Sequence, residues 1–276
     1  MGTWFVTGAS TGIGRAVTEQ LLARGHRVAA TARRPDTLAD LGPEHLLWTA
    51  QLDVTDTARL RSVVEQVFAE FGRIDVVFSN AGAAAFGAAE ELPDEVIEGQ
   101  LALNTIAPIQ LFRAVRPHLR AQGGGRFVQT STMGAHLAGP GGSLYHASKW
   151  GVEGFLESVI GEVAPFGVGI TMVEPGTVRT GFGAATTVAE PLDVYASTPV
   201  GQVRRYLEGA GNLTGDAPGD PARVATAVID SADVTPAPRR LALGSDAFEA
   251  IRAALSTRLA ELAAGEDVAR STDFPR

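Results

Sequence analysis

The chain has 276 residues, 45% of them hydrophobic, which is enough for one large α/β domain with a buried core. The absence of cysteine excludes thiol nucleophiles, disulfides and cysteine-ligated metals, and a net charge of −8 without a basic stripe argues against a nucleic-acid partner. No stretch approaches the roughly 18 consecutive apolar residues of a membrane span, and the first residues lack a secretory signal pattern, so we expect a cytoplasmic protein.

Strand-like and helix-like segments alternate along most of the chain. Short apolar runs predict strands at 3–10, 26–32, 46–54, 73–80, 125–132, 167–174 and 239–244. Apolar residues at helical spacing predict helices at 12–25, 60–71, 93–121, 144–164, 221–232 and 246–264. Strands separated by helices form right-handed βαβ units, so the alternation predicts a parallel sheet.

Two segments break this rhythm. Residues 181–220 contain scattered glycine, proline, threonine and aspartate, and a loop of this length in a compact domain is typically functional, so we interpret it as a substrate lid. Residues 266–276 are interpreted as a polar tail, which leaves a single domain over residues 1–265. The lid is expected to contribute to a moderately apolar pocket through Phe182, Leu192, Tyr195 and Tyr206.

The turn after the first strand, "TGASTGIG", contains Gly8, Gly12 and Gly14. Its spacing differs from the GxGxxG fingerprint and from a P-loop, but the physical reasoning is the same. Glycines let the backbone approach a pyrophosphate, and the start of the following helix offers free N–H groups and the positive end of its dipole. The alternative is that these glycines serve only close packing.

The second strand ends in "TARRP", which places Arg33 and Arg34 where dinucleotide-binding folds choose their cofactor. An acidic residue there binds the ribose 2′-hydroxyl, whereas arginine accommodates a 2′-phosphate. The pair therefore favours NADP(H), and the alternative is an ordinary solvated pair of surface charges.

Tyr145 and Lys149 in "YHASK" stand four residues apart on a predicted helix and therefore share one face. A cation beside a tyrosine favours the phenolate and lowers its pKa toward the range of an acid–base catalyst. Of the 23 basic residues only Lys149 is lysine, so this position uses an ammonium where every other position uses arginine. The alternative is an ordinary surface pair.

Together these motifs resemble the short-chain dehydrogenase/reductase family. The resemblance covers roughly residues 2–180 and comprises "TGASTGIG", "LDV", "SNAG", Asn104, "YHASK" and "PGTVRT", in the family's order and at similar spacings. It implies a Rossmann-type, doubly wound parallel sheet of order 3-2-1-4-5-6-7, with the site at the carboxyl ends of the strands.

The resemblance also implies a cofactor site. Asp53 should contact the adenine, Asn80 should lie beside the ribose, and the residues of "PGTVRT" should flank the nicotinamide. With the arginine pair, the expected cofactor-binding set is Gly8, Ser10, Gly12, Ile13, Gly14, Arg33, Arg34, Asp53, Asn80, Tyr145, Lys149, Pro175, Gly176, Val178 and Thr180.

The implied reaction is hydride transfer between NADP(H) and a carbonyl or secondary alcohol. Tyr145 should be the acid–base, Lys149 should bind the nicotinamide ribose and lower the Tyr145 pKa, and Asn104 should hold a water in a proton relay. An epimerase or dehydratase using the same site, a non-catalytic NADP(H) sensor and an oligomer-building partner of a related enzyme stay open as alternatives. The family habit also implies a homodimer or homotetramer, built on the long helices near 100–121 and 144–164.

The stretch "QTSTMG" offers three hydroxyls at the end of the fifth predicted strand. The family pattern places the catalytic hydroxyl thirteen residues before the tyrosine, which selects Thr132 rather than Ser131. Neighbouring residues on a strand face opposite sides, so both cannot face the substrate if the strand is regular. Thr132 is the expected residue, with Ser131 as the alternative.

The remaining polar residues are interpreted as structural or solvated. The five histidines show no metal-like spacing, and we expect no metal site. Glu90 and Glu91 are interpreted as solvated acids at a loop or helix start, and Glu174 is interpreted as a structural residue.

Overall fold

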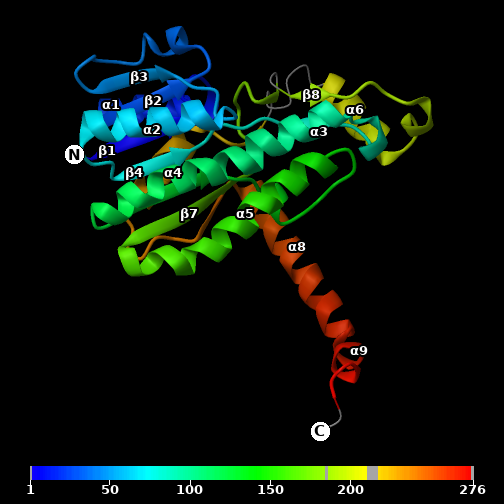
Figure 1. Cartoon of the computed structure of the whole chain (residues 1–276). Helices are drawn as coiled ribbons and strands as arrows, with labels where there is room; N and C mark the ends of the chain where they lie inside the picture. Colours follow the sequence, from blue (N-terminus) through cyan, green and yellow to red (C-terminus); the bar gives the residue numbers. More distant parts are fainter. Residues whose placement is uncertain (1, 184–185, 210–216, 275–276) are drawn as a thin grey trace.

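The core of the protein is a seven-stranded parallel sheet, seen in a computed structural model that describes residues 2–183, 186–209 and 217–274 (Figure 1). Its order is β3-β2-β1-β4-β6-β7-β9, and every neighbouring pair is parallel. Counting these seven strands along the chain gives the order 3-2-1-4-5-6-7, so the predicted Rossmann-type topology is confirmed. The strands are β1 Thr3–Thr7, β2 Arg27–Ala32, β3 Leu47–Gln51, β4 Val76–Ser79, β6 Gly125–Thr130, β7 Val168–Pro175 and β9 Arg240–Leu243.

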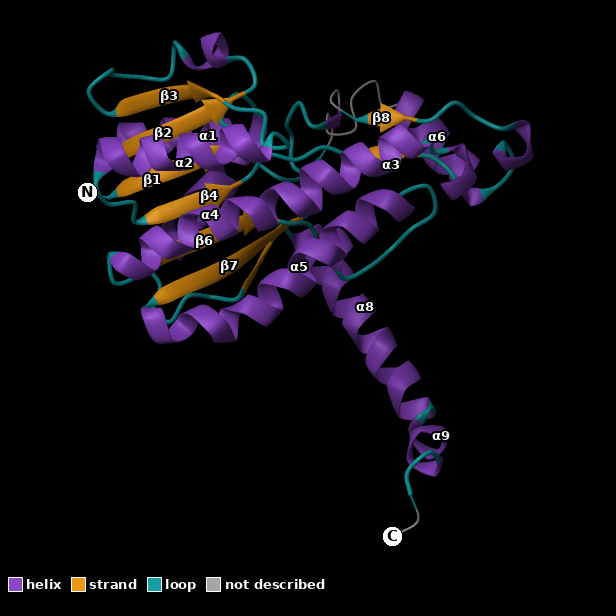
Figure 2. Cartoon of the chain, viewed as in Figure 1, coloured by secondary structure: helices purple, strands orange, loops and turns teal. Residues whose placement is uncertain are grey.

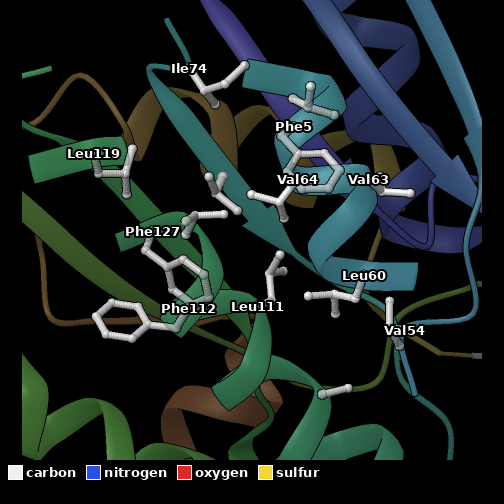
Figure 3. Close-up of a cluster of buried hydrophobic side chains, with 14 of the residues drawn as sticks. Phe5, Val54, Leu60, Val63, Val64, Ile74, Leu111, Phe112, Leu119 and Phe127 are labelled. Carbon is white, nitrogen blue, oxygen red and sulfur yellow. The ribbon is translucent and has the colours of Figure 1, made fainter. Parts of the chain in front are cut away.

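Helices cover both faces of the sheet (Figure 2). Alternation along β1 sends Phe5 to one face and Trp4 and Val6 to the other, where each joins a separate buried cluster. The first cluster packs against α2, α4 and α5, and part of it is drawn in Figure 3. The second packs against α1 and α7. These helices are α1 Gly12–Ala23, α2 Thr57–Phe71, α4 Ala107–Ala121, α5 Ser143–Val163 and α7 Pro221–Ser231.

The helical region predicted at 93–121 is continuous but not uniform. It begins with α3, Asp94–Leu101, and ends with α4, and between them Ala102–Ile106 forms a π-helical turn, η3. Such turns insert one extra residue into the helix and frequently occur at functional sites. Asn104 lies in this turn and is buried, with 1% of its surface exposed.

The lid contains more regular structure than its composition predicts. Strand β8, Thr187–Val188, pairs with β5, Ala85–Phe86, in a second small sheet, and α6, Pro199–Gly209, follows it. These pairings join segments about a hundred residues apart, so a local pattern could not reveal them. Two residues of the lid segment, 184–185, and residues 210–216 lie outside the described residues.

The C-terminal part forms a helical arm that projects from the body (Figure 1). Helix α8 spans Ser245–Ala264, and α9, Glu266–Ser271, forms a helical turn where we expected only a polar tail. Among the described residues, no helix combines the length and apolarity needed to cross a membrane.

Candidate active site

Helix α5 places Tyr145 and Lys149 in its first two turns, beside the carboxyl end of β6. Lys149 Nζ lies 6.0 Å from the centre of the Tyr145 ring and donates a hydrogen bond of 3.0 Å to the carbonyl oxygen of Thr130. Only 4% of the Lys149 surface is exposed. The pair is therefore not a solvated surface pair, because its ammonium group is buried against the end of a central strand.

Burial shifts the pKa of both side chains. It raises the pKa of Tyr145 to about 12, and a hydrogen bond with the Thr132 side chain acts in the opposite direction. It lowers the pKa of Lys149 to about 8, against the negative charge of Glu153, which favours the ammonium. In the ligand-free protein at neutral pH, Tyr145 therefore carries its proton, and Lys149 is closer to losing its charge than a surface lysine.

The two neighbouring hydroxyls after β6 face different partners. The side chain of Thr132 contacts Tyr145. Thr132 also caps the short 3₁₀ turn η4, Met133–Ala135, because its Oγ1 accepts a hydrogen bond of 3.2 Å from the backbone N–H of Gly134. Ser131 is buried, and its Oγ donates to Glu153 Oε1. The strand thus keeps its alternation to its end, and Thr132 is the hydroxyl beside the tyrosine.

The side chain of Asn104 joins the π-helical turn to two neighbouring elements. Its Nδ2 donates to the carbonyl oxygen of Ala83 at 2.9 Å and to Ser148 Oγ at 3.1 Å, and its Oδ1 accepts from the N–H of Ala83 at 3.2 Å. Ser148 precedes Lys149 on α5, so Asn104 lies close to the lysine. The side-chain amide of Asn104 is therefore engaged by the protein itself.

The glycine turn after β1 combines two uses of glycine. Gly8 and Gly12 have φ values of +66° and +58°, which side chains disfavour. Gly14 is needed for packing instead, because a Cβ there would lie 2.3 Å from the carbonyl oxygen of Gly8 and 2.4 Å from Asn80 Nδ2. Asn80 Nδ2 donates to the carbonyl oxygens of Thr7 and Gly8, at 3.3 and 3.2 Å. Asn80 thus fixes the shape of the turn.

The N-terminus of α1 can accept an anion. Thr11, its N-cap residue, makes no capping hydrogen bond with its side chain, and no acidic residue lies in the first turn. The N–H groups of Gly12, Ile13 and Gly14 have no acceptor within the helix itself, as in any first turn, and point beyond its end. This arrangement fits the pyrophosphate of a dinucleotide, with Ser10 in the same turn.

Arg33 and Arg34 lie exposed at the end of β2, beside the end of β3. Within the described part of the chain, neither side chain forms a hydrogen bond or an ion pair. Asp53 lies nearby: hydrogen bonds from the Thr55 hydroxyl and N–H hold the pKa of Asp53 below its usual range, and the charge of Arg33 acts in the same direction. Arg33 and Asp53, both predicted to bind the adenosine end of the cofactor, are therefore neighbours.

The segment after β7 crosses the glycine turn. A Cβ on Gly12 would lie 3.4 Å from Thr180 Cβ, so these two positions face each other. The segment is held by Asp246, whose carboxylate accepts from the N–H of Thr177 at 2.7 Å, and by the pairing of Val178 with Gly219. One stretch of chain between the glycine turn and α8 thus contains four of the predicted cofactor-binding residues: Pro175, Gly176, Val178 and Thr180.

Aromatic side chains surround Tyr145. The rings of Phe86 and Phe182 lie 6.2 Å from the tyrosine ring, centre to centre. Phe182 thus lies beside Tyr145, and its place in a substrate pocket stays a prediction. Tyr195 instead donates to Glu90 Oε1 at 2.6 Å, and Tyr206 is 65% exposed.

The expectation that Glu91 is solvated is wrong. Its side chain is fully buried, forms an ion pair with Arg204 of α6 at 2.5 Å, and accepts from the backbone N–H of Ala88 and Leu192 at 2.6 and 2.8 Å. The pair fastens the lid to the body across 113 residues of sequence. No local pattern distinguishes Glu91 from Glu90, so only the tertiary structure could identify it.

A second buried charge cluster lies beneath the site and also escaped the sequence analysis. Arg240 Nη1 of β9 contacts Glu153 Oε2, Glu174 Oε1 and His136 Nε2. The last three side chains converge closely enough to hold a metal ion, but the guanidinium group lies against all of them and supplies the positive charge. Glu174 thus belongs to a buried ionic cluster, in which it pairs with Arg240.

A parallel sheet with a glycine turn after its first strand, and a Tyr–Lys pair at the carboxyl edge, defines a Rossmann-type protein that binds a nicotinamide dinucleotide. The chain belongs to the short-chain dehydrogenase family, whose model, described as "short chain dehydrogenase", matches residues 3–190. The family assignment makes the protein an oxidoreductase of this class.

Named relatives agree with this assignment. The chain is 37% identical over 254 residues to an oxidoreductase of Botryotinia fuckeliana, with 89% of this chain and 90% of that protein covered. It is 34% identical to a 3-ketodihydrosphingosine reductase of Bacteroides thetaiotaomicron, over 67% of each chain. A solved short-chain dehydrogenase from Streptomyces avermitilis is similar over 99% of this chain and 100% of its own, with 39% identity and a TM-score of 0.91.

Gly14→Ala should destabilise the protein, because its methyl group meets the backbone of Gly8 and the side chain that shapes the turn. We expect a loss of about 1–3 kcal/mol in the free energy of unfolding, measured by denaturant titration. Gly154→Ala on α5 is the matched control, since a Cβ there meets nothing within 4 Å. Equal effects of the two substitutions would contradict the packing role of Gly14.

Proposed function

We propose that the protein is an NADP(H)-dependent oxidoreductase that interconverts a carbonyl compound and a secondary alcohol. The observation that carries this proposal is the convergence of the Thr132 hydroxyl and the Lys149 ammonium on the half-buried side chain of Tyr145. A protein that only senses a dinucleotide has no need for a tyrosine placed between a hydroxyl and a cation.

The residues of the site divide the chemistry among them. When bound, the nicotinamide supplies or accepts a hydride at the substrate carbon. Tyr145, protonated at neutral pH, donates its proton to the carbonyl oxygen in the reductive direction, and Thr132 donates a hydrogen bond to the same oxygen, where negative charge develops. Lys149 holds the ribose hydroxyls and favours the phenolate left after proton transfer.

The proton that Tyr145 donates is proposed to be replaced through Lys149 and Asn104. The backbone of Asn104, in the π-helical turn, holds a water that passes protons toward Lys149, while its side chain fixes the turn to Ala83 and Ser148. Asn80 supports the ribose end indirectly, by holding the glycine turn against β4.

The cofactor preference is assigned to the arginine pair. The guanidinium groups of Arg33 and Arg34 are exposed and form no hydrogen bond or ion pair with the residues that the structure describes. Their donors can therefore bind a 2′-phosphate, the group that distinguishes NADP from NAD. The Gly8–Gly14 turn with the start of α1 is assigned to the pyrophosphate, Asp53 to the adenine, and Pro175–Thr180 to the nicotinamide.

The substrate is proposed to carry an apolar group next to its carbonyl. Phe86 and Phe182 flank Tyr145 and can contact such a group on both sides of the reacting atoms. The name of the Bacteroides relative describes reduction of a 3-keto compound, which is consistent with a ketone as the reacting group. Cytoplasmic location and a homodimer or homotetramer stay predictions.

Purified protein should oxidise NADPH in the presence of a panel of apolar ketones, followed by absorbance. Tyr145→Phe should abolish this turnover, because the ring remains but the proton donor is removed, while cofactor binding measured by NADPH fluorescence is kept. A phenylalanine variant with wild-type activity would rule out Tyr145 as the acid. Cofactor binding without turnover of any carbonyl in the panel would favour a sensor instead.

Thr132→Ala should lower kcat/KM by roughly 100-fold or more, which is the typical effect of losing one donor to a developing oxyanion. Thr132→Ser should retain most of the activity, since it keeps the hydroxyl. Ser131→Ala is the matched neighbour, and we expect less than a roughly tenfold loss because its hydroxyl faces Glu153. Steady-state kinetics with the reverse ranking would assign the reaction to Ser131.

Replacing both Arg33 and Arg34 with alanine should raise the KM for NADPH by roughly tenfold or more, through loss of charge-assisted hydrogen bonds to the 2′-phosphate. The KM for NADH should change little, because it lacks that phosphate. Arg223→Ala, with a side chain 90% exposed on α7, controls for the change in net charge. A wild-type preference for NADH would contradict the NADP assignment.

A further inference from the structure

Helix α5 carries a second buried ionic side chain beside Lys149, in line with the two residues proposed for catalysis. Tyr145, Lys149 and Glu153 follow each other at four-residue intervals, so they share one face of the helix. Glu153 is 3% exposed and Lys149 is 4% exposed. Both meet the end of β6, where Lys149 contacts the carbonyl oxygen of Thr130 and Glu153 contacts the hydroxyl of Ser131.

Glu153 shares its arginine partner with a second carboxylate. Arg240 contacts two buried carboxylates, those of Glu153 and Glu174, so one guanidinium faces two negative charges. His136 Nε2 lies 3.0 Å from the same guanidinium and 3.1 Å from Glu174 Oε1. Glu157 also reaches Arg240, but from a position where 41% of its side chain is exposed.

The buried carboxylate of Glu153 thus contacts the partly exposed guanidinium of Arg240 and lies one helical turn from the buried ammonium of Lys149. A buried carboxylate without compensation is strongly unfavourable, and so is a buried ammonium without one. Two other polar side chains near Lys149, those of Asn104 and Tyr145, carry no charge at neutral pH. Glu153 is thus the acidic residue placed between the arginine and the lysine.

We propose that Glu153 is a positioning residue that acts as the buried counter-ion of Lys149 and keeps it as an ammonium. Ser131 and Arg240 hold the carboxylate in place for this role, which gives the buried serine a function other than catalysis. The proposal rests on the proposed function, in which Lys149 acts as a cation. Electrostatics agree in direction, since Glu153 raises the pKa of Lys149 against the stronger effect of burial.

The composition of the chain allows a direct test. Lys149 is the only lysine, so growth with lysine labelled at Cε and Nζ places a single labelled side chain in the protein. Its NMR signal followed against pH gives the pKa of Lys149 without any turnover. Glu153→Gln keeps the shape and an acceptor oxygen but removes the charge, which disfavours the ammonium. Lys149 should then lose its proton at a pH lower by roughly one unit.

Glu157→Gln is the matched control, because it removes a carboxylate from the same guanidinium on the next turn of the helix, at a more exposed position. We expect a shift below about 0.3 unit, since exposed charges are screened. Glu153→Asp keeps the carboxylate and shortens the side chain, so the pKa of Lys149 should shift by less than in Glu153→Gln. This variant separates charge from packing and also provides the test if Glu153→Gln does not fold.

An unchanged or raised pKa of Lys149 in Glu153→Gln, or a decrease of a full unit in Glu153→Asp, would overturn the proposal. A role of Glu153 in packing alone would not make the shift depend on whether the carboxylate charge is kept. The titration of Lys149 needs neither cofactor nor substrate. A protein that reduces no ketone would therefore contradict the proposed function without affecting the measured pKa shift of Lys149.

Discussion

The register between helix α5 and the end of strand β6 is the constraint on which the site depends. Three successive residues, the last of β6 and the two that follow it, contact three residues of one helix face. The carbonyl oxygen of Thr130 accepts from Lys149, the hydroxyl of Ser131 donates to Glu153, and the side chain of Thr132 contacts Tyr145. A strand turns each residue to the opposite side from its neighbour, so a slip of one residue would exchange the two hydroxyls. The parallel pairing of β6 with β4 and β7 fixes that register.

The same register explains why charges can be buried so close to the sheet. Lys149 lies in a setting that disfavours its charge, and the compensating carboxylate comes from the next turn of its own helix. That carboxylate is fastened in turn by Arg240, from the strand at the edge of the sheet. The catalytic helix, the strand that carries the hydroxyls and the last strand of the sheet are thus joined in one polar network beneath the reacting atoms.

Sequence reasoning succeeded where the determining pattern is local. Apolar periodicity located the seven main strands and the helices around them. The spacing in the family pattern pointed to Thr132, which lies beside Tyr145, and its catalytic role stays a prediction. It failed where partners are far apart in the chain. Glu91 meets Arg204 across 113 residues and Glu153 meets Arg240 across 87 residues, and nothing near these glutamates marks them as buried. Strands β5 and β8 are two residues each, too short for any periodicity.

The residues proposed for catalysis and the aromatic residue Phe182 beside them are held by different parts of the fold. Tyr145, Lys149 and Thr132 belong to a helix and a strand of the central body, whose packing holds them rigidly. Phe182 belongs to the lid, which the Glu91–Arg204 pair and the two-residue pairing of β5 with β8 hold to that body. Substitutions within the lid can therefore change the shape of the apolar wall without moving the reacting groups. Under the proposed function, the residues around Phe182 would therefore influence the substrate range, and the residues of α5 and the end of β6 would determine the reaction type.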